Sequence, residues 1–472
     1  MDKAFTSDRH EALREEVRAF ADQTVRPRVA RMEDTRDVDH ELSAAIARRG
    51  WIGATIPVEY GGMEAGHLAK TIIIEELSRV SAAMGAMVQA SQLGVAKILH
   101  FGTEAQRRRW LPPIADGRCL PTIAVTEPES GGHVLGMSGT AVRDGDHYIL
   151  NARKVFVGNS HVGHVHGVVV RTGPGSKGLS AFLVEYDRPG VRLEPLEPTM
   201  GLHGFSFGEI VMEDARIPVE NRLGEEGEGL DVAYSSSTLY GRPNLTAVAL
   251  GIHRAIVEDT VDYCRQRRLY NAPISEISSI KVRLGDMQSR LMTARLAAYH
   301  AVYLLDQGIP CDTELMNAKL INVEYAIESA RAAMDVIGAR GLQTRYRIER
   351  YLRDAYHVLA PAGTSDVQRL RLAEAALSVE RRQWSERFSK QVRARMPAER
   401  VPGVRAAAQA AAAVHNATAA TATSAATAAT ATSGTTATAT VHGAHGVATE
   451  AGTGAGTGAE IRRRGALGWR SR

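Results

Sequence analysis

The spacing of the apolar residues changes twice along this chain, and no other feature limits its fold as strongly. In the first hundred or so residues, apolar side chains recur three or four positions apart, as at Leu13 and Val17, which predicts amphipathic helices. Between about 121 and 230, short β-branched runs such as Val168–Val170 alternate with Gly, Pro and Asp, which is typical of antiparallel strands. The helical spacing then returns, for example in the series that starts at Leu284.

This order predicts an α+β protein with three domains. An all-α domain covers residues 1–120, an antiparallel β-barrel or sandwich covers 121–230, and a helical bundle covers 231–397. A βαβ arrangement is excluded because nothing helical separates the predicted strands. Residues 398–472 are rich in Ala, Thr and Gly and hold too little bulky apolar surface to offset the entropy of ordering, so we predict a disordered tail there.

The composition excludes several classes of protein. The net charge is only +4 and no stacking motif accompanies the basic residues, so nucleic acid is not a predicted partner. No run approaches the roughly 18 apolar residues that are needed to span a bilayer. The three cysteines are widely separated and the N-terminus carries no apolar signal segment, which together predict a cytoplasmic protein with reduced thiols.

Three closely spaced histidines, His161, His164 and His166, are the main candidate for a metal site. Their spacing would permit metal ligation, but no carboxylate accompanies them and Gly163 indicates a turn. We therefore predict a solvated loop here and no metal.

Five short segments follow one another in a fixed order: Trp51–Gly62, Gly102–Pro113, Val125–Pro128, Gly227–Gly229 and Arg353–Thr364. Together they resemble the acyl-CoA dehydrogenases, flavoenzymes that desaturate thioesters, and the resemblance covers nearly the whole chain before the tail. It implies a four-helix C-terminal bundle, FAD as cofactor and an acyl thioester, carried by CoA or by a carrier protein, as substrate. It further implies an electron-transferring flavoprotein or oxygen as electron acceptor, and a homotetramer or homodimer.

The resemblance also implies which residues contact FAD. The Thr126 segment would contact the pyrimidine side of the flavin, and Phe156 stands where a tryptophan usually covers the ring. Gly158 replaces a threonine whose hydroxyl normally addresses the flavin N5 region. Arg267 would bind the pyrophosphate of a neighbouring subunit's FAD, because a guanidinium suits phosphate oxygens. The remaining implied contacts are the turn at Gly338, near the adenosine, and Gly363 and Thr364, at a helix N-terminus.

The position of the catalytic base is unusual. Ala362 stands where the family has glutamate, and an alanine methyl cannot accept the α-proton of a thioester. The family's second place for the base, one residue before Arg242, is Gly241 here. Tyr240 and Asp366 are the nearest groups in sequence that could substitute. The backbone N–H of Ala362 remains available to polarise a thioester carbonyl.

Three functions follow from this pattern. The first is an FAD-dependent dehydrogenase whose base is atypical or missing, acting on a specialised thioester with an acidic Cα–H. The second is a flavin-dependent monooxygenase or oxidase, because a small residue at 362 leaves space beside the flavin. The third is a flavin-binding homologue without catalytic activity.

Overall fold

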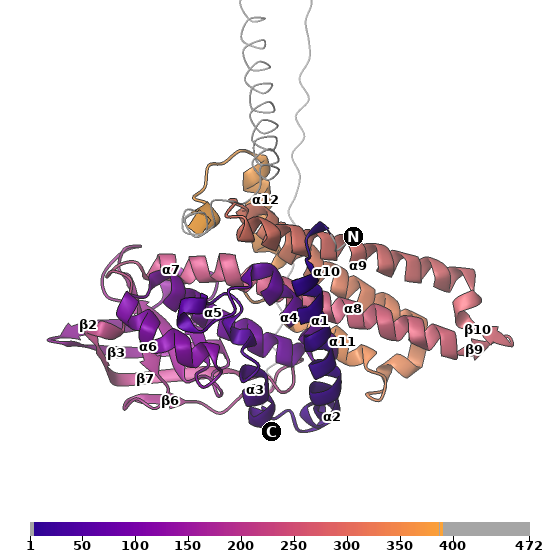
Figure 1. Cartoon of the computed structure of the whole chain (residues 1–472), viewed down its shortest axis with the longest axis horizontal. Helices are drawn as coiled ribbons and strands as arrows, with labels where there is room; N and C mark the ends of the chain where they lie inside the picture. Colours follow the sequence, from indigo (N-terminus) through magenta and orange to yellow (C-terminus); the bar gives the residue numbers. More distant parts are fainter. Residues whose placement is uncertain (1–3, 387, 390–472) are drawn as a thin grey trace, which may run out of the picture. The chain divides into compact units, whose positions relative to one another are not determined.

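The computed structural model describes residues 4–386, 388 and 389 (Figure 1). The predicted disordered tail at 398–472 lies outside the described residues. The first part of the chain is helical, as its apolar spacing predicts. Its helices are α1 (Asp8–Phe20), α2 (Arg26–Thr35), α3 (His40–Ala47), α4 (Gly66–Val80), α5 (Ala82–Phe101) and α6 (Glu104–Ala115), and a π-helical segment at Ala21–Val25 joins the first two.

Helix α6 corrects one expectation from the sequence. Two successive prolines, Pro112 and Pro113, predict the end of the first helical block, but the helix continues through both of them to Ala115. The missing N–H groups would have bonded the carbonyls of Arg108 and Arg109, one turn earlier. Both arginines are exposed, so water can satisfy these carbonyls and the helix tolerates the prolines.

The middle of the chain forms one eight-stranded sheet. The strands are β1 (Pro121–Ala124), β2 (Thr140–Asp144), β3 (His147–Gly158), β4 (Val165–Arg171), β5 (Leu179–Glu185), β6 (Val191–Leu193), β7 (Phe207–Pro218) and β8 (Arg222–Leu223). Their spatial order is β6-β7-β3-β2-β4-β5-β8, and β1 lies beside β4. The pairing is antiparallel as predicted, apart from the parallel pair β1–β4 and one parallel contact between β2 and β4. The runs predicted as strands, including Val168–Val170, lie in β4, β5 and β7.

The last part of the chain returns to helices, and a long helix contains the series predicted from Leu284. These helices are α7 (Gly229–Ser236), α8 (Arg242–Gln266), α9 (Ser278–Asp306), α10 (Asp312–Ile337), α11 (Ile348–His357) and α12 (Ser365–Ala376). A π-helical segment, Ser237–Gly241, joins α7 to α8, and a two-stranded hairpin of β9 (Arg268–Leu269) and β10 (Ala272–Pro273) precedes α9.

The helices of the first and last parts of the chain share one apolar core. One apolar cluster joins Ile73 of α4, Val248 of α8 and Ala298 of α9, while the sheet has a second core around Tyr148 and Phe182. Helix α5 packs on β1 and α4 packs on α8, so these two helices lie between the sheet and the later helices (Figure 1). Within residues 4–386, no helix combines the length and the apolar character that crossing a membrane requires.

Candidate active site

The two positions at which a catalytic carboxylate is missing lie next to each other. Ala362 lies in the turn between α11 and α12, and Gly241 ends the π-helical segment before α8. A Cβ atom placed on Gly241 would lie 3.3 Å from Cβ of Ala362 and 3.6 Å from Cδ2 of Leu93, on α5. Two segments 121 positions apart in sequence therefore meet at one point, and neither brings an acidic side chain to it.

The Ala362–Gly363 turn has an unusual backbone that neighbouring side chains hold in place. Its φ angles are +56° at Ala362 and +94° at Gly363, in the region that favours glycine. Nζ of Lys319 donates to the carbonyl oxygens of Leu359 and Gly363, both at 2.7 Å. Nε2 of Gln368 donates to the carbonyl oxygens of Ala362 and Gly363, both at 3.1 Å. The turn is thus fixed through its carbonyl groups.

Arg242 links the two segments. Its Nε donates to Oε1 of Gln368 at 3.1 Å, and its Nη1 donates to Oγ1 of Thr238 at 2.6 Å. Burial lowers the pKa of the Arg242 guanidinium to about 10 and that of the Lys319 ammonium to about 7. Within residues 4–386 neither side chain forms an ion pair; the carboxylates of Asp312 and Glu324 act on Arg242 and Lys319, respectively, and only partly offset the effect of burial on the two pKa values.

The side chains of Tyr240 and Asp366, the two suggested replacements for the base, are engaged in other contacts. The hydroxyl of Tyr240 is 3.2 Å from Nε2 of His100, and its ring centre is 4.2 Å from Nζ of Lys70, so the side chain packs into helices α4 and α5. Asp366 is corrected outright: its side chain is 93% exposed and forms an ion pair with Arg369 on the surface of α12. In the first turn of a helix, this side chain points to solvent rather than back to the turn.

The residues expected on the flavin side form an exposed aromatic surface. Strand β3 shifts register against β7 between Lys154 and Val157, and Phe156 takes a φ of +56°, so its ring leaves the sheet and is 65% exposed. That ring lies 5.6 Å from the ring of Phe207, which in turn lies 6.1 Å from Phe205. An exposed aromatic face of this kind fits a planar ring system.

Gly158 and Thr126 lie close to this surface. A Cβ on Gly158 would lie 3.0 Å from Cζ of Phe205 and 3.0 Å from Cβ of Ala90, so the packing of Phe205 explains why this position has no side chain. Thr126 is half-buried, and its carbonyl oxygen accepts a hydrogen bond of 2.9 Å from the N–H of Val155. Thr126 is therefore anchored to β3 one residue before Phe156.

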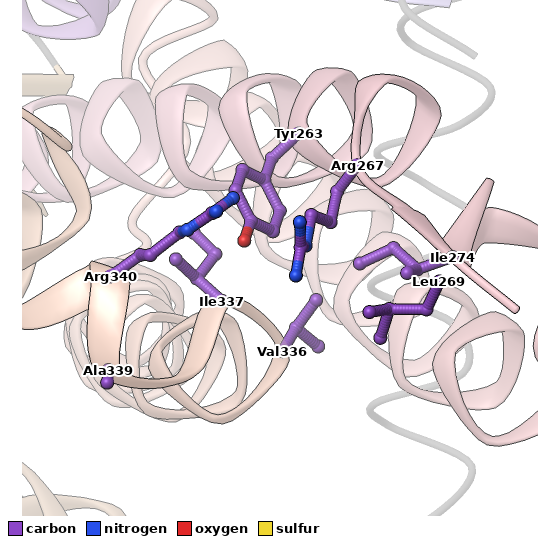
Figure 2. A pocket seen from close by; sticks show the side chains of 8 residues that line it. All are labelled: Tyr263, Arg267, Leu269, Ile274, Val336, Ile337, Ala339 and Arg340. Atoms are coloured by element: carbon purple, nitrogen blue, oxygen red, sulfur yellow. The ribbon is translucent and has the colours of Figure 1, made fainter.

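Arg267 and Gly338 lie at the ends of α8 and α10, where a pocket of about 260 Å³ opens (Figure 2). Figure 2 shows the guanidinium groups of Arg267 and Arg340 on either side of Tyr263, from two different elements. Neither guanidinium has an ion pair with a described residue. Two unpaired guanidinium groups at one pocket fit an anion such as a pyrophosphate. The pocket is lined by Tyr263, Arg267, Leu269, Ile274, Val336, Ile337, Ala339 and Arg340.

Thr364 caps the N-terminus of α12 through its backbone, and its exposed hydroxyl makes no capping bond. The next residue, Ser365, has a buried hydroxyl without a partner among the described residues. Unpaired polar groups at a helix N-terminus also fit an anionic or polar ligand. The aromatic surface, the guanidinium pocket and this helix end are separate features, and each fits one part of a planar, phosphate-bearing ligand.

The histidine cluster differs from its prediction. His166 lies inside β4 and is fully buried, with neither ring nitrogen bonded, and burial lowers its pKa to about 3. Nδ1 of His164 accepts the N–H of Leu120 at 3.0 Å, and Nδ1 of His161 lies 2.9 Å from Oγ of Ser160. The solvated loop is therefore wrong for His166, because the strand continues through it. In the described part of the chain no group of three possible ligands is placed to bind a metal.

Lys319, Phe205 and Phe207 were not found from the sequence, although a signal exists for each of them, whereas no local pattern marks Gln368. Leu315, Lys319 and Val323 recur four positions apart on α10, so a lysine occupies the buried face of a helix. The segment Phe205–Phe207 likewise places two aromatic residues at strand spacing. A charge on an apolar face and a pair of aromatics are the patterns that could have identified them.

Comparison with known proteins agrees with the order of helical, strand and helical segments. Three family models cover the chain: the acyl-CoA dehydrogenase N-terminal domain at 7–118, its middle domain at 122–215 and its C-terminal domain at 227–377. An acyl-CoA dehydrogenase of Bacillus subtilis is 34% identical over 77% of this chain and 97% of its own. A 3-(aryl)acrylate reductase of Clostridium sporogenes is 33% identical over 79% of this chain and 100% of its own.

Solved structures agree with the sequence comparison. Butyryl-CoA dehydrogenase from Megasphaera elsdenii aligns with a TM-score of 0.77 and 30% identity, over 79% of this chain and 99% of its own. The prolyl acyl carrier protein oxidase AnaB aligns at 0.75 and 27%, over 79% and 99%. An FAD complex of PigA aligns at 0.75 and 26%, over 79% and 98%. The chain belongs to the acyl-CoA dehydrogenase family.

Proposed function

We propose that this chain is an FAD-dependent oxidoreductase that acts on an acyl thioester, and that its reaction does not use the family's usual carboxylate base. One observation carries the proposal. The N–H of Ala362 makes no hydrogen bond with any described residue, while the carbonyl of the same residue is held by Gln368. A free N–H in a fixed turn is the donor that a thioester carbonyl needs as negative charge develops on its oxygen.

The family's enzymes are FAD-dependent, and the residues of this chain fit that cofactor. When bound, FAD supplies the two-electron oxidant for a hydride that leaves Cβ of the substrate. Phe156 would cover one face of the ring system, and the N-terminal end of α12 at Thr364 would contact its polar edge. Arg267 and Arg340 would hold the pyrophosphate of the FAD bound by a neighbouring copy, which makes a homodimer or homotetramer part of the proposal.

The α-proton has no carboxylate to accept it at either of the family's two positions. A positioned base is worth roughly 10²–10⁴ in rate, so a simple fatty acyl thioester would react slowly here. Substrates whose Cα–H is already acidic depend less on a strong base. The proposal therefore favours a specialised acyl group, carried by CoA or by a carrier protein, with an electron-transferring flavoprotein as the electron acceptor.

A second candidate is an oxidase that acts on a carrier-bound acyl group. It is supported by the similarity to AnaB, a prolyl acyl carrier protein oxidase, and by the small side chains at Ala362 and Gly241. These leave room beside the flavin surface for dioxygen. The two candidates differ in how fast oxygen reoxidises the reduced protein.

An anaerobic titration of the purified protein tests the proposal. The protein is expected to show the absorbance of oxidised flavin and to be bleached by one or more members of a panel of acyl-CoA and acyl-carrier-protein thioesters. Admitting air then separates the two candidates, because rapid recovery of the colour indicates the oxidase. A colourless protein that FAD cannot reconstitute would falsify both.

Restoring the carboxylate gives a second test. The substitution Ala362→Glu is expected to raise desaturation of butyryl-CoA by roughly 10²–10⁴, because Gly241 leaves space opposite the new side chain. The matched control is Ala362→Gln, which has the same shape but cannot act as a base. Equal rates for the two variants would contradict the assignment of position 362 as the vacant place of the base.

A further inference from the structure

We propose that Lys319 and Gln368 are positioning residues for the thioester carbonyl: they fix the Ala362–Gly363 turn so that the N–H of Ala362 faces the substrate oxygen. This inference rests on the proposed function, because it assumes that a thioester is bound at Ala362. Neither side chain touches the substrate, and both act through the backbone of the turn.

The backbone of the turn needs an external restraint. A φ of +56° at alanine costs on the order of 1–2 kcal/mol relative to the ordinary region, because Cβ then lies too close to the carbonyl oxygen. Left alone, an alanine in a short connection between two helices would relax out of this conformation. The direction of its N–H would change with it, since φ is the rotation about the N–Cα bond.

Lys319 supplies one restraint. It is fully buried in α10, and its Nζ bonds two carbonyl groups, those of Leu359 and Gly363, on either side of Ala362. A buried ammonium is costly unless its hydrogens are bonded. Breaking these two bonds would leave the ammonium without these partners and would remove a donor from each of the two carbonyl groups. The turn cannot open at this end without leaving Lys319 unsatisfied.

Gln368 supplies the other restraint. It is fully buried in the first turns of α12, and its Nε2 bonds the carbonyls of Ala362 and Gly363. Its orientation is fixed because Nε of Arg242 donates to its Oε1. Arg242 follows Gly241 directly, so the amide of Gln368 couples the turn to the segment that faces it.

The N–H of Ala362 is the polar group of the turn that these restraints leave available. Four side-chain donor bonds fix the carbonyls of Leu359, Ala362 and Gly363, and no described residue accepts the N–H of Ala362. Because the side chains bond only the carbonyl groups of the turn, the N–H of Ala362 stays available to a ligand that binds beside it. The restraint therefore determines where a carbonyl oxygen must lie to be recognised.

The test compares two probes that differ only in the carbonyl group. Acetyl-CoA contains the thioester but has no Cβ hydrogen to lose, whereas S-ethyl-CoA is the corresponding thioether without the carbonyl. Isothermal titration calorimetry on the FAD-loaded protein gives both dissociation constants. The ratio used below is the dissociation constant of S-ethyl-CoA divided by that of acetyl-CoA. We expect the wild type to bind acetyl-CoA about threefold to tenfold more tightly, which corresponds to one hydrogen bond.

Two variants remove the restraints. Lys319→Met deletes the ammonium, and Gln368→Glu keeps the acceptor for Arg242 but cannot donate to the turn. Both are expected to lower the ratio at least twofold. Lys97→Met is the matched control: Lys97 is also fully buried and also bonds two carbonyls, those of Thr122 and Gly167, at 2.8 and 2.9 Å, but away from the turn.

The outcomes separate the inference from the proposed function. A wild-type ratio of one contradicts thioester binding at Ala362, and the inference falls with it. A wild-type ratio above three that both variants retain overturns the inference alone. A lowered ratio in the two variants, with an unchanged ratio in Lys97→Met, supports it. If Lys319→Met does not fold, Gln368→Glu against Lys97→Met decides the question by the same criterion.

Discussion

Phe156 is a residue whose position contributes little to folding. Its ring is 65% exposed on a backbone with positive φ, so the folded chain gains little from it. We predict that Phe156→Leu changes the free energy of unfolding of the FAD-free protein by less than about 0.5 kcal/mol. It should weaken FAD binding about twofold to tenfold, because an aromatic contact contributes about 0.5–1.5 kcal/mol.

Fluorescence titration of the FAD-free protein with FAD, beside urea unfolding, measures both quantities. Val142, which is 64% exposed on β2, provides the control: Val142→Ala should leave FAD binding unchanged. An unchanged FAD affinity in Phe156→Leu would show that the ring does not cover the flavin.

Asp354 is a buried acid whose ionisation opposes folding. It accepts the N–H of Leu202 at 2.7 Å, and burial raises its pKa to about 6 from an ordinary value of 3.8. Because the folded state binds this proton more tightly, its contribution to stability is complete below about pH 4 and is lost as the pH rises through 6. Over that range the loss is about 3 kcal/mol.

The variant Asp354→Asn keeps an acceptor for Leu202 but cannot titrate. The difference in unfolding free energy between wild type and variant should therefore fall by about 3 kcal/mol from pH 4 to pH 7. Urea unfolding at several pH values measures this difference. A difference that stays flat between pH 4 and pH 7 for Asp354→Asn would contradict its buried ionisation.

At the scale of elements, two helix N-termini cap each other. The carboxylate of Asp312, at the start of α10, accepts the N–H groups of Trp384 and Ser385 at 2.7 and 2.9 Å. In return, Oγ of Ser385 accepts the N–H of Cys311 at 2.9 Å. The helical turn at 384–386 is thus attached to α10, and the ring of Trp384 stacks on Tyr234 of α7 at 5.6 Å.

Removing this carboxylate should detach the turn. We predict that Asp312→Ala lowers the free energy of unfolding by about 1–3 kcal/mol, because the buried N–H of Ser385 and the part-buried N–H of Trp384 lose their acceptor. Intrinsic tryptophan fluorescence should also report a more exposed Trp384. The control Asp366→Ala changes a first-turn carboxylate that is exposed, and should cost less than about 0.5 kcal/mol. Equal losses in both variants would argue against mutual capping.

At the scale of the whole molecule, one buried ionic network ties the first helices to the last. Oε2 of Glu75, on α4, accepts the Tyr299 hydroxyl of α9 at 2.6 Å, and its Oε1 accepts Arg295 at 3.1 Å. Arg254 of α8 donates to Glu76 at 2.6 Å, and Arg14 of α1 donates to the same carboxylate at 3.1 Å. Burial alone would raise the pKa of Glu75, but the surrounding arginines lower it.

Breaking this network should loosen all four helices together. We predict that Glu75→Gln lowers the free energy of unfolding by about 3–5 kcal/mol, because the buried guanidinium groups of Arg14 and Arg254 then share the single carboxylate of Glu76. Since the folded pKa is lowered, the stabilisation is present above about pH 4.5 and is lost as the pH falls further. Scanning calorimetry gives the loss. Glu16→Gln, in a half-exposed pair with Arg49, should cost less than about 1 kcal/mol, and a similar loss in both would refute the prediction.

Local patterns in the sequence were enough to predict most of the helices and strands. The three- and four-residue spacing at Leu284 predicted α9, and the β-branched run at Val168–Val170 predicted β4. Both predictions succeed because residues close together in the sequence determine which face of a helix or strand is apolar. Local rules failed at Pro112, which lies inside α6 because water can satisfy the carbonyl groups that lose a donor there. They also failed at His166, because β4 extends further than the composition of this segment indicates.

Local residues alone are enough to derive the helix–strand–helix order, the family and the absence of a carboxylate at positions 362 and 241. The packing of the folded chain brings these two positions into contact, places Tyr240 against α4 and α5, and lets Lys319 and Gln368 hold the turn. Side-chain spacing reports which face of a helix is buried. The partners on that face lie 44 or 126 residues away, and only the packing of whole helices brings them within bonding distance.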